Sequence, residues 1–505
     1  MNKIYPILIS IAFCILCLSL PNAFVSDDIP GISKNVLIGT WKNITASSGH
    51  LLYLNGIISN SIFIIAGNES PIPYRLLNII IHGITMILAW KLIKKIWNKD
   101  IAWIAVSLFA IHPMILESVI WISGLQYPLY TTLLLGSLLC YTNISASKKW
   151  WIGTLLCYIL ALLTSEKAFI FPLIIITYDL LIVQKDKRPW KQWLLFIGIT
   201  IIPILFLMSQ TTTRLTQINT TPSGEQFYNP LIQIPTAIGW YLRYFFYPNA
   251  LTLYHSEENF VTMPNLIINS ALTISYIWLT IIAWKKNKKT AFFLTLGIIA
   301  LLPTLTPLKV AWIIAERYAY STILSWSILI GYGVWWASSR LKKPMLAPII
   351  IALIVGTYSI RSLNRVADWK NQDTLWIATS KTSPSDPKTH NNMGDVYARN
   401  GDLINALKEF SKAIELYPAY ADAYHNAGNT LEQMKKPNEA ITYYEKAIAI
   451  NPTLWQSYTQ LANIYYQQKD FQKTKEYLEK ANAILPNVPA ITDALKKINK
   501  ELEGK

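Results

Sequence analysis

Apolar stretches long enough to cross a membrane recur along the first 360 residues of the chain. A helix needs about 20 mainly apolar residues to span the hydrocarbon core of a bilayer. Eleven stretches approach this length, and each predicts a transmembrane helix. They lie at 4–22, 73–93, 101–115, 126–143, 150–164, 168–184, 193–209, 265–284, 291–306, 320–338 and 345–361.

Basic residues in the connecting loops predict the orientation of these helices. Together with Lys3, five clusters in alternate loops hold 18 of the 26 Lys and Arg residues of the region 1–360, which marks that side as cytoplasmic. Eleven crossings then place the N-terminus in the cytoplasm and residues 361–505 outside it. The clusters are Lys91, Lys94, Lys95 and Lys99; Lys148 and Lys149; Lys185, Lys187, Arg188 and Lys191; Lys285, Lys286, Lys288 and Lys289; and Arg340, Lys342 and Lys343.

Two apolar segments allow a second interpretation. Counting 231–247 as a crossing would move the basic cluster at 285–289 outside, so this segment is predicted as an external interfacial or re-entrant helix. The first segment also resembles a cleaved signal peptide, with Pro21-Asn22-Ala23 at its end, but a retained helix is preferred because ten spans follow.

The C-terminal part of the chain repeats with a period of 34 residues. Pro384, Pro418, Pro452 and Pro486 follow this spacing. Three further registers keep the same period: Gly394, Gly428 and Ala462; Ala413, Ala447 and Ala481; and Phe410, Tyr444 and Leu478. This is the tetratricopeptide period and pattern, with small residues where paired helices touch.

The pattern predicts three tetratricopeptide repeats, at 387–420, 421–454 and 455–488, and a capping helix at 489–505. Residues 362–386 form the expected linker. Stacked repeats of this kind make concave surfaces that bind proteins; a spacer without a partner is the alternative. The predicted fold class is therefore all-α: a polytopic membrane domain at 1–361, in which 24–72 is the first external loop, followed by an α-solenoid.

Composition agrees with this division. Apolar residues make up 52% of the chain and charged residues only 15%, which excludes a single soluble domain and a disordered chain. The net charge of +16 divides into +14 for residues 1–360 and +2 for residues 361–505, so it does not indicate a nucleic-acid partner. The four cysteines lie inside apolar runs and predict neither a disulfide framework nor a metal site.

Charged residues at the external ends of the predicted helices are the candidate site. Such residues are costly at membrane depth and are usually functional. They are Asp27 and Asp28; His112 and Glu117; Glu166 and Lys167; Arg243; and Glu316 and Arg317. Taken one by one, a solvated helix end, a helix cap at His112 and a structural pair between Glu316 and Arg317 explain them as well.

The combination favours group transfer from a lipid-linked donor. A hydroxyl acceptor needs a carboxylate to take its proton in the transition state. A polyprenyl-phosphate leaving group gains negative charge and needs positioned cations. Carboxylates and cations on one rim of a membrane cavity meet both needs.

Several sequence runs together resemble a known family. They are Phe24-Val25-Ser26-Asp27-Asp28; the His-Pro-x3-Glu-Ser-Val-Ile-Trp-Ile-Ser-Gly run at 112–124; Ser165-Glu166 with Pro172 and Tyr178-Asp179; Tyr241-Leu242-Arg243-Tyr244 with Pro248 and Leu251; Ala315-Glu316-Arg317-Tyr318; and Arg365-x3-Trp369. In this order, and with the repeats, the chain resembles the transmembrane and tetratricopeptide-repeat protein O-mannosyltransferases. These belong to the GT-C superfamily, which also contains the dolichyl-phosphate-mannose protein mannosyltransferases.

The resemblance implies an inverting transfer of a hexose, mannose in the best-known members. The donor would be a polyprenyl phosphate carrier, and the acceptor a Ser or Thr hydroxyl of an extracytoplasmic protein. Asp27 would be the catalytic base, and Asp28 would orient a substrate. Arg243 and Arg317 are the candidate phosphate clamps. No metal ligand is assigned, and a requirement for a divalent metal is left open.

Two positions depart from the family pattern. Relatives commonly carry Arg where this chain has Leu125, and Lys where it has Ser165, with Lys167 two positions later. Both changes remove a cation expected near the carrier phosphate. They leave the identity of the donor, and activity itself, open.

Two rival functions remain at this point. One is an oligosaccharide ligase or polymerase of the cell envelope, although the large early loop favours a monosaccharide transferase. The other is a membrane-anchored repeat scaffold, for which a single span would suffice. A prokaryotic plasma membrane, with the repeats extracytoplasmic, is the expected location; the endoplasmic reticulum, which has the same topology, is the alternative.

Overall fold

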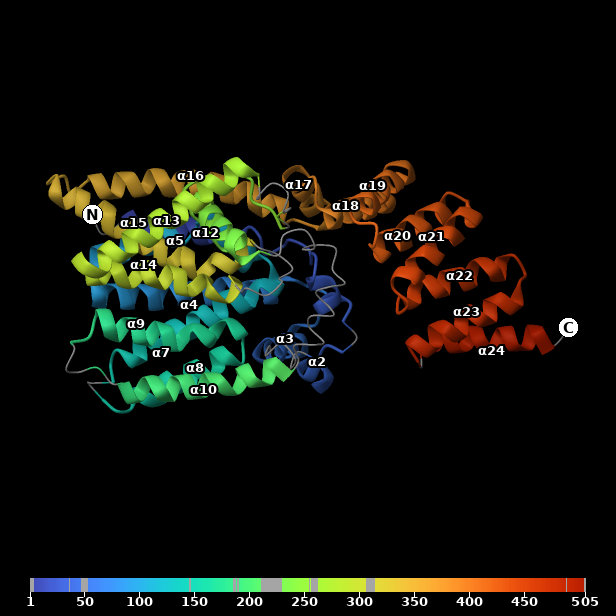
Figure 1. The fold of residues 1–505 in the computed structure, drawn as a ribbon, viewed down its shortest axis with the longest axis horizontal. Helices are drawn as coiled ribbons and strands as arrows, with labels where there is room; N and C mark the ends of the chain where they lie inside the picture. The colour runs from blue at the N-terminus through green and yellow to red at the C-terminus, as the bar shows by residue number, and fades with distance from the viewer. Residues whose placement is uncertain are drawn as a thin grey trace. The chain divides into compact units, whose positions relative to one another are not determined.

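The computed structural model describes residues 4–35, 37–46, 53–144, 147–184, 188, 190–209, 229–253, 255, 262–305, 314–486 and 488–503. All regular secondary structure in these ranges is helical, which confirms the all-α prediction (Figure 1). The chain divides into two compact units, one ending at Leu375 and the other beginning at Trp376. Lys185 and Lys187 of the predicted cytoplasmic clusters lie outside the described residues.

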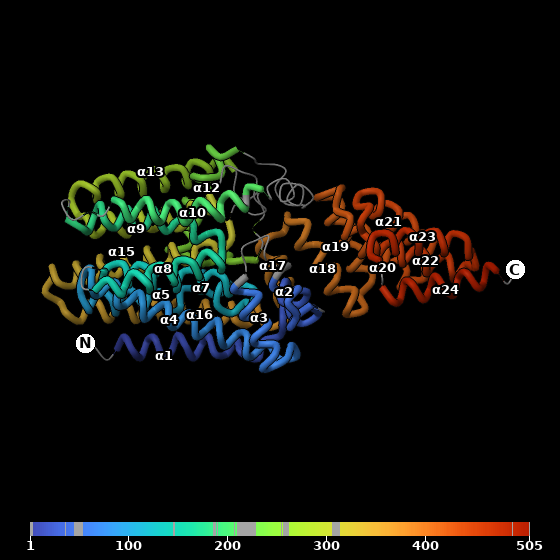
Figure 2. Tube along the Cα trace, turned by 90° about the horizontal axis from the view of Figure 1, so that it is seen from below, coloured from blue at the N-terminus to red at the C-terminus, as the bar shows by residue number. Residues whose placement is uncertain are grey.

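The first unit is a bundle of apolar helices. Figure 2 shows the axes of α1, α4, α5, α7 and α8 running in roughly the same direction. Its longer helices are α1 (Ile4–Cys17), α3 (Tyr53–Ala66), α4 (Ile72–Ile96), α5 (Lys99–Phe109), α7 (Gln126–Tyr141), α8 (Trp150–Leu162), α9 (Phe171–Leu181), α10 (Trp190–Ser209), α12 (Pro230–Phe246), α13 (Met263–Lys286), α14 (Lys288–Leu301), α15 (Tyr320–Arg340) and α16 (Leu346–Asp368). Its short elements include α2 (Trp41–Ala46), η3 (Pro113–Ile115), α6 (Leu116–Ile120), η4 (Ile122–Leu125), η5 (Glu166–Ile170) and η9 (Glu316–Ala319), and α17 (Gln372–Thr382) follows α16.

Fewer helices qualify as membrane spans than the eleven expected. Within the described ranges, α4, α13 and α16 are long and apolar enough to cross a membrane, and a fourth span results if the bent pair Lys99–Phe109 and Pro113–Ile120 counts as one. The predicted number is therefore not confirmed. Length is the reason for some of the helices that do not qualify: α8 has 13 residues and α9 has 11, and at 1.5 Å per residue such helices are shorter than a hydrocarbon core of about 30 Å.

The bend of 63° in that pair falls within the span predicted at 101–115. Pro113 has no backbone N–H to donate and restricts the preceding residue, so α5 ends at Phe109 and a new turn starts at Pro113. The segment predicted as interfacial or re-entrant forms α12, which packs along α13. Its buried residues include Tyr241 and Phe245.

The predicted repeats are present as helix pairs. The first helix of each repeat is α18 (Pro387–Arg399), α20 (Ala421–Gln433) or α22 (Trp455–Gln467), and the second is α19 (Leu403–Leu416), α21 (Pro437–Ile450) or α23 (Phe471–Ile484). The starts of the first helices keep the period of 34 residues, and α24 (Pro489–Glu503) begins one period later. Ile491 and Ile498 of α24 join a core cluster with Leu478 of the third repeat.

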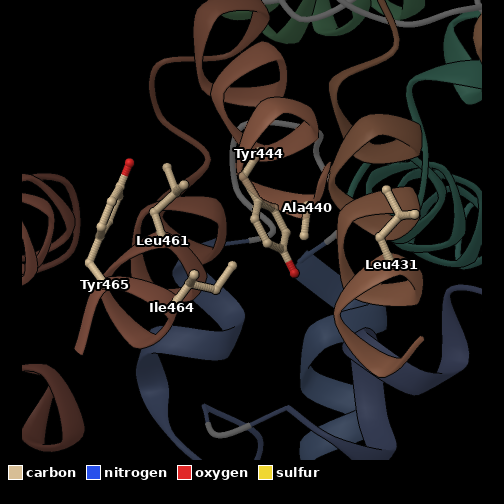
Figure 3. Packing of buried hydrophobic residues seen from close by; sticks show 6 residues of the cluster. All are labelled: Leu431, Ala440, Tyr444, Leu461, Ile464 and Tyr465. Atoms are coloured by element: carbon tan, nitrogen blue, oxygen red, sulfur yellow. The ribbon is translucent and has the colours of Figure 1, made fainter. Parts of the chain in front are cut away.

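Small residues sit where the paired helices touch, as the pattern predicted. A Cβ added to Gly428 would lie 2.7 Å from the ring of Tyr444, and one added to Gly394 would lie 2.6 Å from Phe410. Tyr444 then packs in a core shared by two repeats, which consists of Leu431, Ala440, Tyr444, Leu461, Ile464 and Tyr465 (Figure 3). Each repeat is therefore completed by its neighbour, as in other solenoids.

Candidate active site

The loop after α1 separates the two adjacent acids predicted as catalytic. Ser26 has a left-handed backbone (φ 52°), and its N–H donates to the side-chain oxygen of Gln372 at 2.8 Å. Beyond this turn Asp27 is exposed, whereas Asp28 is completely buried. Adjacent acids in one sequence motif thus have opposite environments.

Asp28 is anchored by the turn at η4. One carboxylate oxygen accepts hydrogen bonds from the N–H of Ser123 at 2.8 Å and from its hydroxyl at 2.6 Å. Burial raises the pKa of Asp28 to about 6, and the bonds from Ser123 and the charge of Arg75 oppose that rise. Gly124 lets the η4 turn lie close to α6, because a Cβ at this position would lie 2.8 Å from the carbonyl oxygen of Glu117.

Arg75 holds the same loop from the other side. Its guanidinium donates to the carbonyl oxygens of Leu20, Asn22, Ala23 and Ile120 at 2.6–3.0 Å. Sequence reasoning missed both Arg75 and Ser123 as site residues. The signal for Arg75 was present, because it is a lone cation in the first turn of a predicted span.

Glu117 and Arg317 form a buried ion pair. The guanidinium contacts one carboxylate oxygen of Glu117, and the N–H of Arg317 donates to the other at 2.9 Å. Arg317 also lies over the rings of Trp121 and Tyr318, at 5.5 and 5.1 Å from their centroids. Lys167 lies 5.7 Å from the centroid of Tyr318, which brings η5 to the same region.

Glu316 pairs with Arg365 at 2.8 Å, in a second buried pair. The predicted structural pair between Glu316 and Arg317 is therefore wrong, because these neighbours in η9 use different partners. Burial raises the pKa of Glu316, and Arg365 opposes that rise. Arg365 was part of the recognised motif, but the sequence assigned it no role.

His112 serves the backbone in this structure. Its Nε2 lies 3.1 Å from the carbonyl oxygen of Phe245, and its Nδ1 accepts from the N–H of Met114 at 3.3 Å. The ring is fully buried and stacks on Phe245. This geometry favours the helix-cap interpretation of His112 over a direct role with substrate.

Glu166 and Lys167 begin η5, where Ser165 caps the turn by accepting from the N–H of Lys167 at 3.3 Å. The ammonium of Lys167 also lies 5.3 Å from the centroid of Tyr127. Both residues are half-buried. Ser165, which stands where relatives carry Lys, thus has a structural use.

Arg243 borders a large apolar cavity. The guanidinium carbon lies 3.9 Å from the centroid of the Trp240 ring, and one N–H donates to Asn265 at 3.0 Å. The cavity has a volume of about 720 Å³. Its lining is mostly aromatic and aliphatic and includes Trp240, Arg243, Phe245, Tyr276, Leu279 and Trp326.

The predicted site residues thus fall into three groups rather than one ring. Asp27 and Asp28 form the first group, together with Ser123. Glu117 and Arg317 form the second, together with the other buried ion pair and Lys167. Arg243 forms the third, at the apolar cavity. In the part of the chain that the structure describes, no three or more His, Cys, Asp or Glu side chains are grouped to hold a metal ion.

Known families match both parts of the chain. The family described as dolichyl-phosphate-mannose-protein mannosyltransferase matches residues 57–209. Tetratricopeptide repeat families match residues 386–453 and 443–476. Solved structures also match, among them the MamA protein, at 21% identity over 27% of this chain and 74% of that chain. The TM-score of 0.24 is too low to support a structural comparison.

Curated relatives extend over most of the chain. Protein O-mannosyl-transferase TMTC3 of Mus musculus is 23% identical over 423 residues, which is 73% of this chain and 45% of the relative. TMTC3 of Homo sapiens is 24% identical over 410 residues, with the same coverage. Protein O-mannosyl-transferase F38B6.6 of Caenorhabditis elegans is 25% identical over 444 residues, which is 82% of this chain and 63% of the relative.

The helical fold and the repeats define a helical membrane protein with a tetratricopeptide-repeat unit, part of which matches a mannosyltransferase family. The chain is thus similar to the transmembrane and tetratricopeptide-repeat protein O-mannosyltransferases, the family that its motifs resemble. It spans about half the length of the first of these relatives.

Proposed function

We propose that this protein transfers a hexose, mannose in the first instance, from a polyprenyl phosphate to a Ser or Thr hydroxyl of an extracytoplasmic protein. The observation that carries the proposal is the pair Asp27 and Asp28. One carboxylate is exposed, and its neighbour is buried and fixed by Ser123. The matching mannosyltransferase family supports the donor class.

The reaction needs one proton acceptor and one leaving group. The carboxylate of Asp27 takes the proton of the acceptor hydroxyl while the hydroxyl oxygen attacks the anomeric carbon. The bond from that carbon to the phosphate oxygen breaks, and the polyprenyl phosphate leaves with the electron pair. Asp28 acts as a positioning residue, because its hydrogen bonds to Ser123 hold the loop that carries Asp27.

The proposal is tested by radiolabelled sugar transfer. The full-length protein is supplied with dolichyl-phosphate-mannose, dolichyl-phosphate-glucose or the matching undecaprenyl donors, and with a panel of Ser- and Thr-containing acceptors. Transfer to a hydroxyl from one donor class is expected. Transfer of a preassembled oligosaccharide would favour the ligase instead. Absence of transfer from every donor would favour the scaffold, in line with the changes at Leu125 and Ser165.

The shorter apolar helices are also proposed to lie in the membrane. α8 exposes Ile152, Leu156 and Ile159, and α10 exposes Leu194 and Ile202. Apolar surface of this extent is unfavourable in water and suits lipid. The N-terminus would be cytoplasmic and the repeats external. The named relatives are animal proteins, so they do not support the predicted prokaryotic host.

Arg243 is proposed to bind the donor phosphate. It lies at the edge of the apolar cavity, which suits a polyprenyl chain, and an Arg can grip phosphate through two parallel hydrogen bonds. Arg243→Ala is expected to raise the KM for the donor roughly 10- to 100-fold, as for a lost bond to a charged group. Arg243→Lys keeps the positive charge but loses the two parallel hydrogen bonds, so a smaller rise in the KM for the donor is expected.

Steady-state kinetics at fixed acceptor concentration measure this effect. The matched control is Arg340→Ala at the end of α15, an exposed Arg in a predicted cytoplasmic cluster. If Arg243→Ala leaves the donor KM unchanged, Arg243 has no part in phosphate binding.

The repeats are proposed to dock the acceptor protein through a row of amides. Asn392, Asn426 and Gln460 occupy equivalent positions on α18, α20 and α22, and all three are half-buried. Asn426 donates to Asn391 at 3.0 Å and Gln460 to Asn429 at 3.4 Å, which links neighbouring repeats. Amides can pair with the backbone of an extended segment, because each offers both a donor and an acceptor.

Replacing Asn392 and Asn426 together by Ala is expected to raise the KM for a full-length acceptor roughly 3- to 10-fold, as for one or two neutral hydrogen bonds. Transfer to a short peptide should be unchanged. The control variant removes the exposed pair Lys412 and Glu415 of α19. An equal loss with both acceptors would contradict docking through this row.

A further inference from the structure

A second cavity lies beside the acid pair in the first unit. It has a volume of about 280 Å³. A water molecule occupies about 30 Å³ in the liquid, so the cavity has room for a small organic group. Its polar lining consists of Asn35, Asn43, Asn55, Asn78, Ser123 and Gln126, with Ser59 in α3, and is called the amide pocket below.

The chemistry of the amide pocket is neutral. Amide and hydroxyl groups dominate its polar lining, and none of the described lining residues carries a charge. Leu125, which stands where relatives carry Arg, is also part of the wall. Such a wall presents amide and hydroxyl groups beside apolar surface, but no counter-charge for a phosphate. It suits a ligand with several hydroxyls and no charge.

Two buried atoms of the pocket wall lack a partner within the described structure. Asn78 is fully buried and donates to the carbonyl oxygen of Trp121 at 2.9 Å, but its Oδ1 has no hydrogen bond. Asn55 donates weakly to Thr164 at 3.3 Å, and its Oδ1 is likewise unpaired. An unpaired buried acceptor is costly, so these two asparagines mark polar positions of the wall that the protein's own hydrogen bonds do not fully satisfy.

The wall is held in place by its own hydrogen bonds. Asn35 donates to Asn43 at 2.9 Å, and Asn43 donates to Asn60 at 2.8 Å. Asn60 in turn donates to the carbonyl oxygen of Thr40 at 2.8 Å. A wall fixed in this way needs little reordering when a ligand binds.

The pocket shares residues with the proposed catalytic loop. Ser123 lines it and donates to Asp28 at 2.6 Å, and Gly31 lines it and donates through its N–H to the carbonyl oxygen of Asp27 at 2.9 Å. A ligand in the pocket therefore has the acid pair at its border.

We propose that the amide pocket holds the hexosyl group of the donor while the phosphate stays outside it. This inference rests on the proposed function and specifies how its donor sugar is recognised. An acceptor peptide is the less suitable occupant, because its backbone would have to continue through both ends of a cavity of this size.

Equilibrium binding of two lipids to the full-length protein in nanodiscs tests the inference. Dolichyl-phosphate-mannose and the sugar-free methyl ester of dolichyl phosphate are both singly charged phosphodiesters, so they differ in the hexose and not in charge. The unmodified protein is expected to bind the sugar-bearing lipid more tightly. Asn55→Leu should weaken binding of that lipid roughly 3- to 10-fold and leave the sugar-free lipid unaffected. Unchanged binding of the sugar-free lipid also shows that the variant is folded.

Two serines of α3 provide a matched pair of variants. Ser59 and Ser61 both donate to a carbonyl oxygen of their own helix, but only Ser59 lines the pocket. Ser59→Ala should weaken binding of the sugar-bearing lipid and Ser61→Ala should not. This pair decides the question if Asn55→Leu fails to fold.

Three results would overturn the inference. The first is equal affinity of the unmodified protein for both lipids. The second is an equal loss of affinity for both lipids in Ser59→Ala. The third is a loss of affinity that affects the acceptor peptide alone. Sugar-selective binding without any transfer would support the proposed role of the amide pocket but contradict the proposed function. Failure of the inference and failure of the proposed function are therefore distinguishable.

Discussion

Replacing Asp27 by Asn is expected to lower turnover roughly 10²- to 10⁴-fold, the usual cost of losing a general base. Asn is nearly isosteric with Asp but cannot take the proton of the acceptor hydroxyl. Because Asp27 is exposed, folding and donor binding should be unchanged. The measurement is kcat for sugar transfer at saturating donor and acceptor, with lipid binding as the check on folding.

Asp28→Asn is the matched comparison for Asp27. Its side chain is buried and accepts from Ser123, so its loss should disturb the position of the loop and affect substrate affinity more than turnover. Near-normal turnover in Asp27→Asn together with lost turnover in Asp28→Asn would exchange their roles. Full activity of the double variant would remove the pair from the mechanism and make Glu117 the next candidate.

Arg317→Met is expected to destabilise the protein by about 3–5 kcal/mol, because it leaves the carboxylate of Glu117 buried without its partner. Glu117 is completely buried, and the side chain of Arg317 is 10% exposed, so water cannot replace the lost contact. The measurement is the loss of folded protein on heating in detergent, followed by size-exclusion chromatography.

The double variant Arg317→Met with Glu117→Gln separates a buried charge from a phosphate clamp. Removing both charges should recover most of the stability, since replacing a buried pair is often nearly neutral. A stable double variant that no longer binds dolichyl phosphate would assign Arg317 to the donor site. Full stability of the single variant Arg317→Met would contradict the structural role of the pair.

The sequence alone determined the organisation of this protein wherever local patterns sufficed. The 34-residue period placed the repeats, because each repeat has the same helix contacts and the same small residues at Gly394 and Gly428. The ordered motifs indicated a resemblance to the family that the comparisons match, and the acids after the first span marked the loop of Asp27. These features depend on residues close together in the chain or on periodic spacing.

Tertiary structure decided what the charged residues do. Glu316 and Arg317 are adjacent, yet one pairs with Arg365 and the other with Glu117, which lies 200 residues away in sequence. Hydropathy likewise could not show that Pro113 divides one predicted span into two short helices.

The amide pocket is a further feature that only the fold could reveal. Its residues come from the first loop, from α3 and α4, and from the turn at η4, and none of them stands out in the sequence as a charged group would. Hydrogen-bond partners and cavities arise from contacts between distant segments. A pattern of neighbouring residues therefore predicts which elements form, whereas the packing of those elements decides which side chains meet.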